Sequence, residues 1–346
     1  MKTGAPGHRG SGLIKFEEAI TLSTVSSISG TLKRKKTRRG ITDKQLKYLF
    51  LMPCIALLVF LILYPLIWSA YLSFTDYRAV QGRFRLFPGL VKEKPGVKQI
   101  KPNAVGFKNY KDILRDEYIW KHYRTTGKFV IFSVLAQSLI GLGLALLFNR
   151  EFKGKGIITT LILAPMMLSP VVVGMFWNYM LEPNWGVINY IQNTFFGLPR
   201  IEWLAHENTA LFGIIIADTW MWSPFMFLFC LAGVSAIPKY LYEAAEVNKA
   251  SGWFRFSHIT FPLMWPLMMI AMIFRTMDAF KLFDIGWGMT QGGPGFSSQT
   301  VSMLLYRDAF LSSKTGVSCA FAYILLILIV ALSNIYIKYL LKARAR

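Results

Sequence analysis

Charged residues lie inside stretches of the chain that are otherwise almost wholly apolar, and three of them are set back from the ends of those stretches. Asp218 lies within the run 209–235, and Arg275 and Asp278 lie within the run 263–284. Charged side chains are costly in lipid, so within membrane segments they face a partner group or a polar pathway. Two interpretations stay open. Arg275 pairs with Asp218 or Asp278 and locks two helices together, or the three charges form part of a site for a polar solute.

Aromatic and apolar residues accompany these charges at helical spacing. Trp222 and Phe225 share a helix face with Asp218. Ala279 and Leu282 continue the face that carries the other two charges. Carboxylates and an arginine can hydrogen-bond to hydroxyl groups, and aromatic rings can stack on a sugar ring. The residue types therefore suit a sugar site.

Signatures of catalysis or cofactor binding are absent from the sequence. There is no G-x-x-x-x-G-K-[ST] phosphate loop, no nucleophile elbow and no pair of catalytic carboxylates. The four histidines stand singly in tails and loops, and the three cysteines fall inside apolar runs, so no zinc spacing occurs. We therefore expect a chain that is not an enzyme, binds no cofactor or metal, and depends on another chain for energy.

The composition indicates a protein that crosses a membrane several times. Of the 346 residues, 54% are hydrophobic and only 16% are charged, whereas soluble domains carry about 25% charged residues. The net charge of +21 would suggest nucleic acid in a soluble protein. Here the basic residues follow from membrane topology, because cytoplasmic loops are enriched in Lys and Arg, and we expect no nucleic-acid partner.

A helix that spans a bilayer needs about 20 mostly apolar residues, and six apolar runs in the sequence are at least that long. Prolines lie within several of them and predict kinks, which neighbouring helices make tolerable in a membrane. We expect an all-α membrane protein with six transmembrane helices, at 47–73, 126–148, 157–181, 209–235, 263–284 and 316–341.

The distribution of Lys and Arg orients these helices. The basic tail 1–46, the loop 238–262 and the tail 342–346 are rich in these residues, which predicts cytoplasmic N and C termini. The loop 74–125 carries 12 Lys or Arg and disagrees, although the bias weakens for long translocated loops. We expect a periplasmic loop there, and a transmembrane core over 126–341.

The polar segment 238–262 separates two apolar runs. It begins with Pro238, which suits the first turn of a helix, and places Glu243 early, where a helix N-terminus favours negative charge. We expect two short helices at the membrane surface, joined near Ser251-Gly252. The segment is either an amphipathic connector or a docking helix that inserts into a groove on a soluble partner.

The same segment resembles a motif of a known family. Glu243-Ala244-Ala245 followed by Ile259-x-Phe261-Pro262 is similar to the EAA loop of membrane subunits of binding-protein-dependent ABC importers. The family has Gly where this chain has Lys249, and Leu where it has Phe261. Four further runs are similar to motifs of carbohydrate-importer permeases: 106–110, 186–189, 290–294 and 306–310.

The resemblance implies the permease core of a type I ABC importer in a bacterial or archaeal cytoplasmic (inner) membrane. It implies a second permease, two cytoplasmic ATPase subunits that use ATP and Mg, and a substrate-binding protein that delivers a sugar or sugar derivative. The alternatives are a secondary transporter, for which no internal repeat is seen, or a non-ABC membrane scaffold. The implied ATPase-coupling residues are Glu243, Ala244, Ala245, Lys249, Ile259 and Pro262. The implied substrate-pathway residues are Asp218, Met221, Trp222, Phe225, Arg275, Asp278, Ala279 and Leu282.

Overall fold

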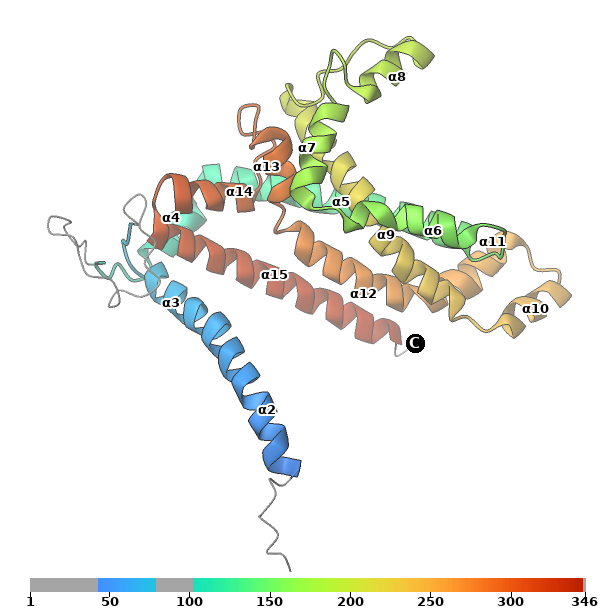
Figure 1. Ribbon diagram of the computed structural model, residues 1–346, viewed down its shortest axis with the longest axis horizontal. Helices are drawn as coiled ribbons and strands as arrows, with labels where there is room; N and C mark the ends of the chain where they lie inside the picture. Colours follow the sequence, from blue (N-terminus) through green and yellow to red (C-terminus); the bar gives the residue numbers. More distant parts are fainter. Residues whose placement is uncertain (1–42, 79–101, 345–346) are drawn as a thin grey trace, which may run out of the picture. The chain divides into compact units, whose positions relative to one another are not determined.

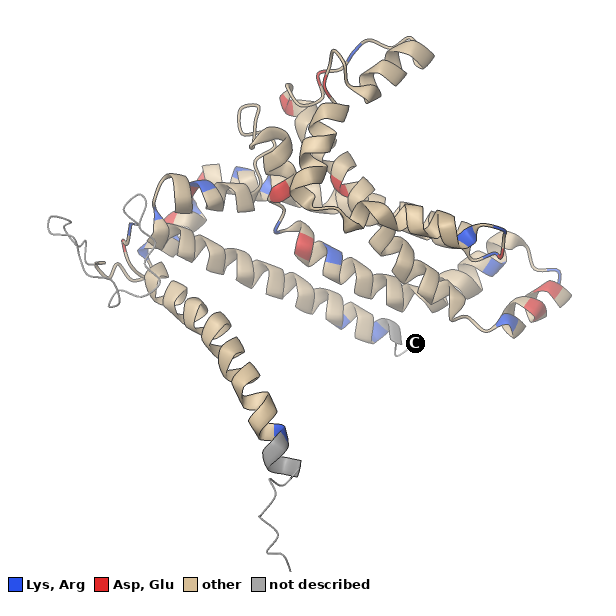
Figure 2. Ribbon diagram, viewed as in Figure 1, with Lys and Arg blue, Asp and Glu red and all other residues tan. Residues whose placement is uncertain are grey.

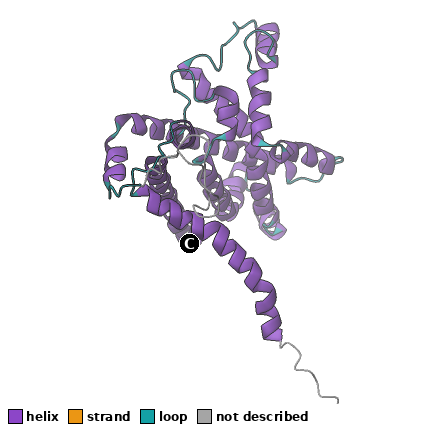
Figure 3. Ribbon diagram, turned by 60° about the vertical axis from the view of Figure 1, so that its left-hand side comes forward, coloured by secondary structure: helices purple, strands orange, loops and turns teal. Residues whose placement is uncertain are grey.

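The computed structural model describes residues 43–78 and 102–344, and their regular secondary structure is helical (Figures 1 and 3). Within that part of the chain the extended pairing is limited to one isolated bridge, between Thr75 and Ala104. The all-α expectation is therefore confirmed for the described residues. Most of the predicted tail 1–46 and much of the predicted loop 74–125 lie outside them.

The chain divides into two compact units, Met1–Pro65 and Leu66–Arg346. In the first unit α2 (Asp43–Leu58) continues through the π-helical turn η1 (Val59–Leu63) into the start of α3 (Tyr64–Ser73). The helical run Lys47–Ser73 is long and apolar enough to cross a membrane, which agrees with the first predicted span.

Four long helices run through the second unit. They are α5 (Glu117–Phe148), α9 (Glu207–Ser235), α12 (Phe261–Ala279) and α15 (Thr315–Arg344). α5 begins well before the predicted residue 126, because the side chain of Asp116 caps it by accepting from the main-chain N–H of Tyr118. The predicted loop 74–125 therefore contains α4 (Lys108–Arg115) and the first turns of α5.

The third predicted span, 157–181, is not one straight helix. α6 (Lys155–Leu163) and the short turn η2 (Ala164–Met167) are followed by α7 (Pro170–Met180), at a bend of 98°. Ser169 takes an extended conformation because the proline that follows disfavours the helical one. The described residues thus hold five candidate membrane spans, or six if this bent pair is one span.

Short helices connect the long ones. α10 and α11 lie in the segment 238–262, whereas α8, α13, α14 and the turn η4 lie in the other connections of the second unit (Figure 1). Figure 2 shows that charged residues gather in these connections and are sparse along the long helices. The bounds are α8 (Val187–Phe196), α10 (Lys239–Val247), α11 (Gly252–Arg255), η3 (Phe256–Thr260), α13 (Asp284–Thr290), α14 (Val301–Tyr306) and η4 (Arg307–Leu311).

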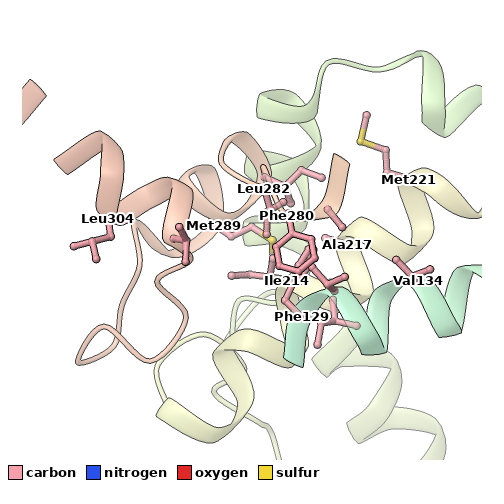
Figure 4. Close-up of a cluster of buried hydrophobic side chains, with 14 of the residues drawn as sticks. Phe129, Val134, Ile214, Ala217, Met221, Phe280, Leu282, Met289 and Leu304 are labelled. Carbon is pink, nitrogen blue, oxygen red and sulfur yellow. The ribbon is translucent and has the colours of Figure 1, made fainter. Parts of the chain in front are cut away.

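The core of the second unit forms where α5 and α9 pack against each other and against α12 and α13. Phe129 of α5, Ile214 of α9 and Leu282 before α13 meet in one buried apolar cluster (Figure 4). At Gly141 of α5 a Cβ atom would lie 2.6 Å from the Cβ of Met226 in α9, so only glycine allows this approach. This packing fixes α5, α9 and α12 as the frame that positions the charged residues.

Candidate functional site

Arg275 of α12 lies at the centre of a buried polar cluster. Its side chain is only 3% exposed, and its Nη2 donates to both carboxylate oxygens of Asp218 on α9. Its Nη1 donates to Oδ2 of Asp278 at 2.8 Å, one turn along the same helix. The structure thus brings together the three charged residues that the sequence singled out, with one guanidinium bound to both carboxylates.

Gln137 of α5 completes the cluster. Its Oε1 accepts from Nε of Arg275 at 2.8 Å, and its Nε2 donates to Oδ2 of Asp218 at 2.8 Å. Three helices are therefore joined through buried hydrogen bonds in which the charges are paired, as burial requires. Sequence reasoning missed Gln137, although an amide within the apolar run 126–148 was a signal of the same kind as the charges.

One edge of the cluster is accessible. The carboxylate side chain of Asp278 is 51% exposed. The ring of Trp222 is partly buried and lies 5.1 Å from the Arg275 guanidinium carbon, within cation–π range. Phe225 is partly buried and meets Trp222 edge-on. An exposed carboxylate and two aromatic rings therefore border the buried ion pair.

The other candidate pathway residues do not share this edge. Met221, Ala279 and Leu282 are at most 8% exposed and belong to the apolar core cluster. Figure 4 shows Met221 and Leu282 among the core side chains. In this chain these three residues pack the helices together, and their part in a substrate pathway stays a prediction.

α10 presents two of the six candidate coupling residues on its surface. Glu243 and Ala244 are exposed, whereas Ala245 is 9% exposed and packs inward. The apolar side chains of Tyr240 and Val247 are 64% and 83% exposed. A short helix with an acidic residue, a small residue and two uncovered apolar side chains is suited to contact another protein.

Lys249 ends α10 in a left-handed conformation, with φ at 52°. The main-chain N–H of Ala250 donates to the carbonyl of Ala245, and the N–H of Lys249 donates to the carbonyl of Glu246, each at 2.9 Å. This pair of bonds is the Schellman motif, whose left-handed position usually holds glycine. The turn at the family's Gly position is thus formed here by a lysine.

The second half of the segment is one continuous helix with the following span. Ser251 caps α11, and the helix runs on through the π-helical turn η3 into α12, so that Gly252–Ala279 forms 28 helical residues. The expectation of two separate short helices is therefore wrong in its second half. A π-helical turn directly before Pro262 accommodates the missing N–H of that residue without ending the helix. Ile259 is partly buried and Pro262 is exposed.

The segment 290–301 begins with the motif run 290–294 and is hydrogen-bonded to the first part of α5. Oε1 of Gln299 lies 2.8 Å from Nε2 of His122, and the main-chain N–H of Val301 donates to Oγ1 of Thr126 at 2.9 Å. No group of three or more potential metal ligands occurs within 43–78 and 102–344. These contacts are structural, and they fix the loop that follows α13.

The sequence and fold together define a membrane permease component. The model of the family described as "Binding-protein-dependent transport system inner membrane component" matches residues 137–346. The chain belongs to this family, and it is therefore a permease subunit of such a transport system and not its enzymatic part.

Several similar proteins are named for the solute that they transport. The chain is 31% identical to the trehalose/maltose transport system permease protein MalF of Thermococcus litoralis over 296 residues, covering 86% of this chain and 94% of that one. It is 31% identical to the sulfoquinovosyl glycerol transport system permease protein SmoG of Agrobacterium fabrum, covering 86% and 90%. It is 35% identical to the sn-glycerol-3-phosphate transport system permease protein UgpA of the same organism, covering 69% and 82%.

The fold is also that of a solved transporter. A chain of the bacterial alginate ABC transporter, in complex with an alginate pentasaccharide-bound periplasmic protein, superposes with a TM-score of 0.70 at 19% identity. The superposition covers 86% of this chain and 94% of that chain. This superposition shows that the two chains share a fold.

Proposed function

We propose that the chain forms one half of the membrane pathway of an ATP-driven importer for a sugar or a sugar derivative. The observation that carries this proposal is the accessible edge made by Trp222, Phe225 and Asp278, fixed by the buried pair of Arg275 and Asp218. Aromatic faces beside a hydrogen-bonding carboxylate suit the stacked faces and hydroxyl groups of a sugar ring. The solutes named for three relatives are trehalose/maltose, sulfoquinovosyl glycerol and sn-glycerol-3-phosphate. These carbohydrates and polyol phosphates support the same class of solute for this chain.

An ATP-driven importer of this kind needs further subunits. A second permease supplies the other half of the pathway, two cytoplasmic ATPase subunits hydrolyse ATP with Mg, and a periplasmic or extracellular binding protein delivers the solute. The chain itself holds no cofactor. It lies in the cytoplasmic membrane of a bacterium or archaeon, with both termini and α10 in the cytoplasm.

The mechanism is alternating access. Closure of the ATPase dimer moves α10, and the helices that flank the segment 238–262 carry Asp218 and Arg275. Their movement opens the accessible edge toward the binding protein. In this mechanism Glu243 and Ala244 contact the ATPase groove, Ala245 and Lys249 fix the shape of the turn, and Ile259 and Pro262 lie at the entry to the following span.

The coupling claim is tested at Ala244. Because Ala245 is 9% exposed and Ala244 is exposed, Ala244→Arg places bulk in the partner contact without disturbing the fold. We expect this variant to assemble in the membrane but to lose solute-stimulated ATP hydrolysis and uptake in reconstituted vesicles. Ala205→Arg, an exposed alanine in the segment before α9, is the matched control and should transport normally. Full transport by Ala244→Arg rejects the coupling role.

The pathway claim is tested at Trp222. Uptake by Trp222→Ala should show a raised KM for the cognate sugar, because the stacking surface is lost. The control Trp220→Ala removes a tryptophan of the same helix that instead contacts Trp177 and Phe176. An unchanged KM in Trp222→Ala rejects the pathway role. An equal loss of uptake in both variants also rejects it, because it indicates a general packing defect.

A further inference from the structure

The helix α8 uses its polar face entirely within its own segment. Asn189 is 1% exposed, donates to the carbonyl of Ile201 and accepts from its N–H, each at 3.0 Å. Gln192 and Asn193 donate to main-chain carbonyls of the same returning segment, 198–201, at 2.7 and 3.2 Å. Three amide side chains thus fasten the returning segment to one side of the helix.

The opposite face of α8 is apolar and exposed. Val187, Tyr190, Ile191 and Phe195 are 48%, 65%, 42% and 75% exposed. Their spacing of three and four residues places them on one side of the helix. The helix VINYIQNTFF contains no charged residue. Among residues 43–78 and 102–344, this largely apolar stripe is therefore left without a partner.

The position of α8 relates it to the membrane. It follows α7, the second half of the bent candidate span, and the ring of Trp185 lies 5.5 Å from that of Tyr179 near the end of α7. The carboxylate of Glu182 fixes the intervening turn by accepting from the main-chain N–H of Trp185 at 2.8 Å. Figure 1 shows α8 at the far end of α7, apart from α12 and α15.

We propose that α8 lies in the lipid–water interface, with its stripe of Val187, Tyr190, Ile191 and Phe195 inserted among the lipid acyl chains. Tyr and Trp are the residues that gather at the interface beside a spanning segment. An amphipathic helix with a continuous apolar side suits this position. The proposal rests on the membership of the chain in a membrane transport family and not on the identity of the solute.

A soluble partner fits this surface less well than lipid. A delivery protein that binds and leaves would expose the four apolar side chains to water in every cycle, which opposes dissociation of an apolar contact. Transient interfaces also carry a polar and charged rim around their apolar centre, whereas α8 supplies no charge. Lipid remains in place throughout the cycle and needs no charged complement.

The experiment is site-directed spin labelling of the assembled transporter in lipid nanodiscs. Cys54, Cys230 and Cys319 are first replaced by alanine. One label is then introduced by Phe195→Cys in the apolar stripe, and a matched label by Asn193→Cys on the polar face. We expect the label at 195 to collide more with dissolved oxygen, which concentrates in lipid, and the label at 193 to collide more with a water-soluble nickel chelate.

Two other results overturn the proposal. Preferential access of the chelate to the label at 195 means that the stripe faces water. Protection from both reagents means that a protein covers the stripe, and repeating the measurement without the binding protein identifies which one. If Phe195→Cys does not assemble, Tyr190→Cys reports on the same stripe. Uptake measured on the same labelled variants keeps a failure of this proposal distinct from a failure of the transport function.

Discussion

Arg275 of α12 binds Asp218 of α9 and Asp278 of its own helix with different nitrogens of one guanidinium. The Asp218 carboxylate is 1% exposed, whereas that of Asp278 is 51% exposed. The same arginine therefore closes a helix–helix contact on one side and orients an accessible carboxylate on the other. The two interpretations that the sequence left open, an ion pair and a solute site, are compatible in this geometry.

Substitutions at Asp218 and Arg275 should have non-additive effects on the stability of the protein. Arg275→Met alone leaves the buried Asp218 carboxylate without a charged partner, which costs about 3–5 kcal/mol. Asp218→Leu costs less, because Arg275 keeps its ion pair with Asp278. The double variant removes both charges and should recover much of the loss. The measurement is the thermal unfolding midpoint of the purified complex in detergent, with transport assayed in parallel. A double variant as unstable as the sum of the two single variants would contradict this view of the pair.

Asp278→Asn should separate transport from stability. Because the carboxylate is half exposed, its pairing contributes only about 0–1 kcal/mol, and the unfolding midpoint should barely move. The KM for the solute should rise, since the accessible hydrogen-bonding charge is lost. Glu151→Gln, which removes a surface carboxylate paired with Lys155 at 3.1 Å, is the control. An unchanged KM in Asp278→Asn would remove this residue from the pathway.

Lys249→Gly should stabilise the protein. An L-residue in the left-handed region pays about 1–2 kcal/mol that glycine does not, offset by about 0.5–1 kcal/mol of extra backbone freedom in the unfolded chain. We expect a small rise in the unfolding midpoint, and none for Lys249→Ala, which keeps the strain. Coupling of ATP hydrolysis to uptake should persist, since the turn is unchanged. A lower midpoint in the glycine variant would show that the lysine side chain itself stabilises the loop.

Two glycines on α5 provide a matched pair. A Cβ at Gly141 would lie 2.6 Å from the Cβ of Met226 and 2.7 Å from the main-chain nitrogen of Phe227, whereas a Cβ at Gly143 meets nothing within 4 Å. Gly141→Ala should therefore destabilise by about 1–3 kcal/mol through overpacking, and Gly143→Ala should be neutral or stabilising by up to about 1 kcal/mol. Thermal unfolding of both variants tests the close approach of α5 and α9, and equal midpoints would refute it.

Much of the fold was accessible from apolar run length, because a spanning helix needs a fixed number of apolar residues. The bend of 98° between α6 and α7 was not, since Pro165 and Pro170 predict a break but not its angle. By contrast, α9 continues through Pro224 and α12 continues through Pro266, although these prolines also predict a break. Proline marks where a helix lacks a hydrogen bond, and the surrounding packing decides how far it turns.

The sequence identified the charged residues that the structure brings together but not the whole buried cluster. Charge within an apolar run identified Asp218 and Arg275 because burial of charge demands a reason. Helical spacing then added Met221 and Leu282, which turn toward the core, because a helix face is wider than the site on it. Gln137 carried a similar signal as an amide within an apolar run, but only tertiary packing shows that it lies beside Asp218 and Arg275.

The uninterrupted helix from Gly252 to Ala279 has a mechanical consequence. Arg275, which is paired with Asp218 of α9, divides this helix into a long part of about 35 Å and a short part of about 6 Å, at about 1.5 Å per residue. The contact between Arg275 and Asp218 therefore lies near one end of the helix Gly252–Ala279. In the alternating-access mechanism proposed above, this unequal division would turn a wide movement of the loop end into a small displacement at Asp278.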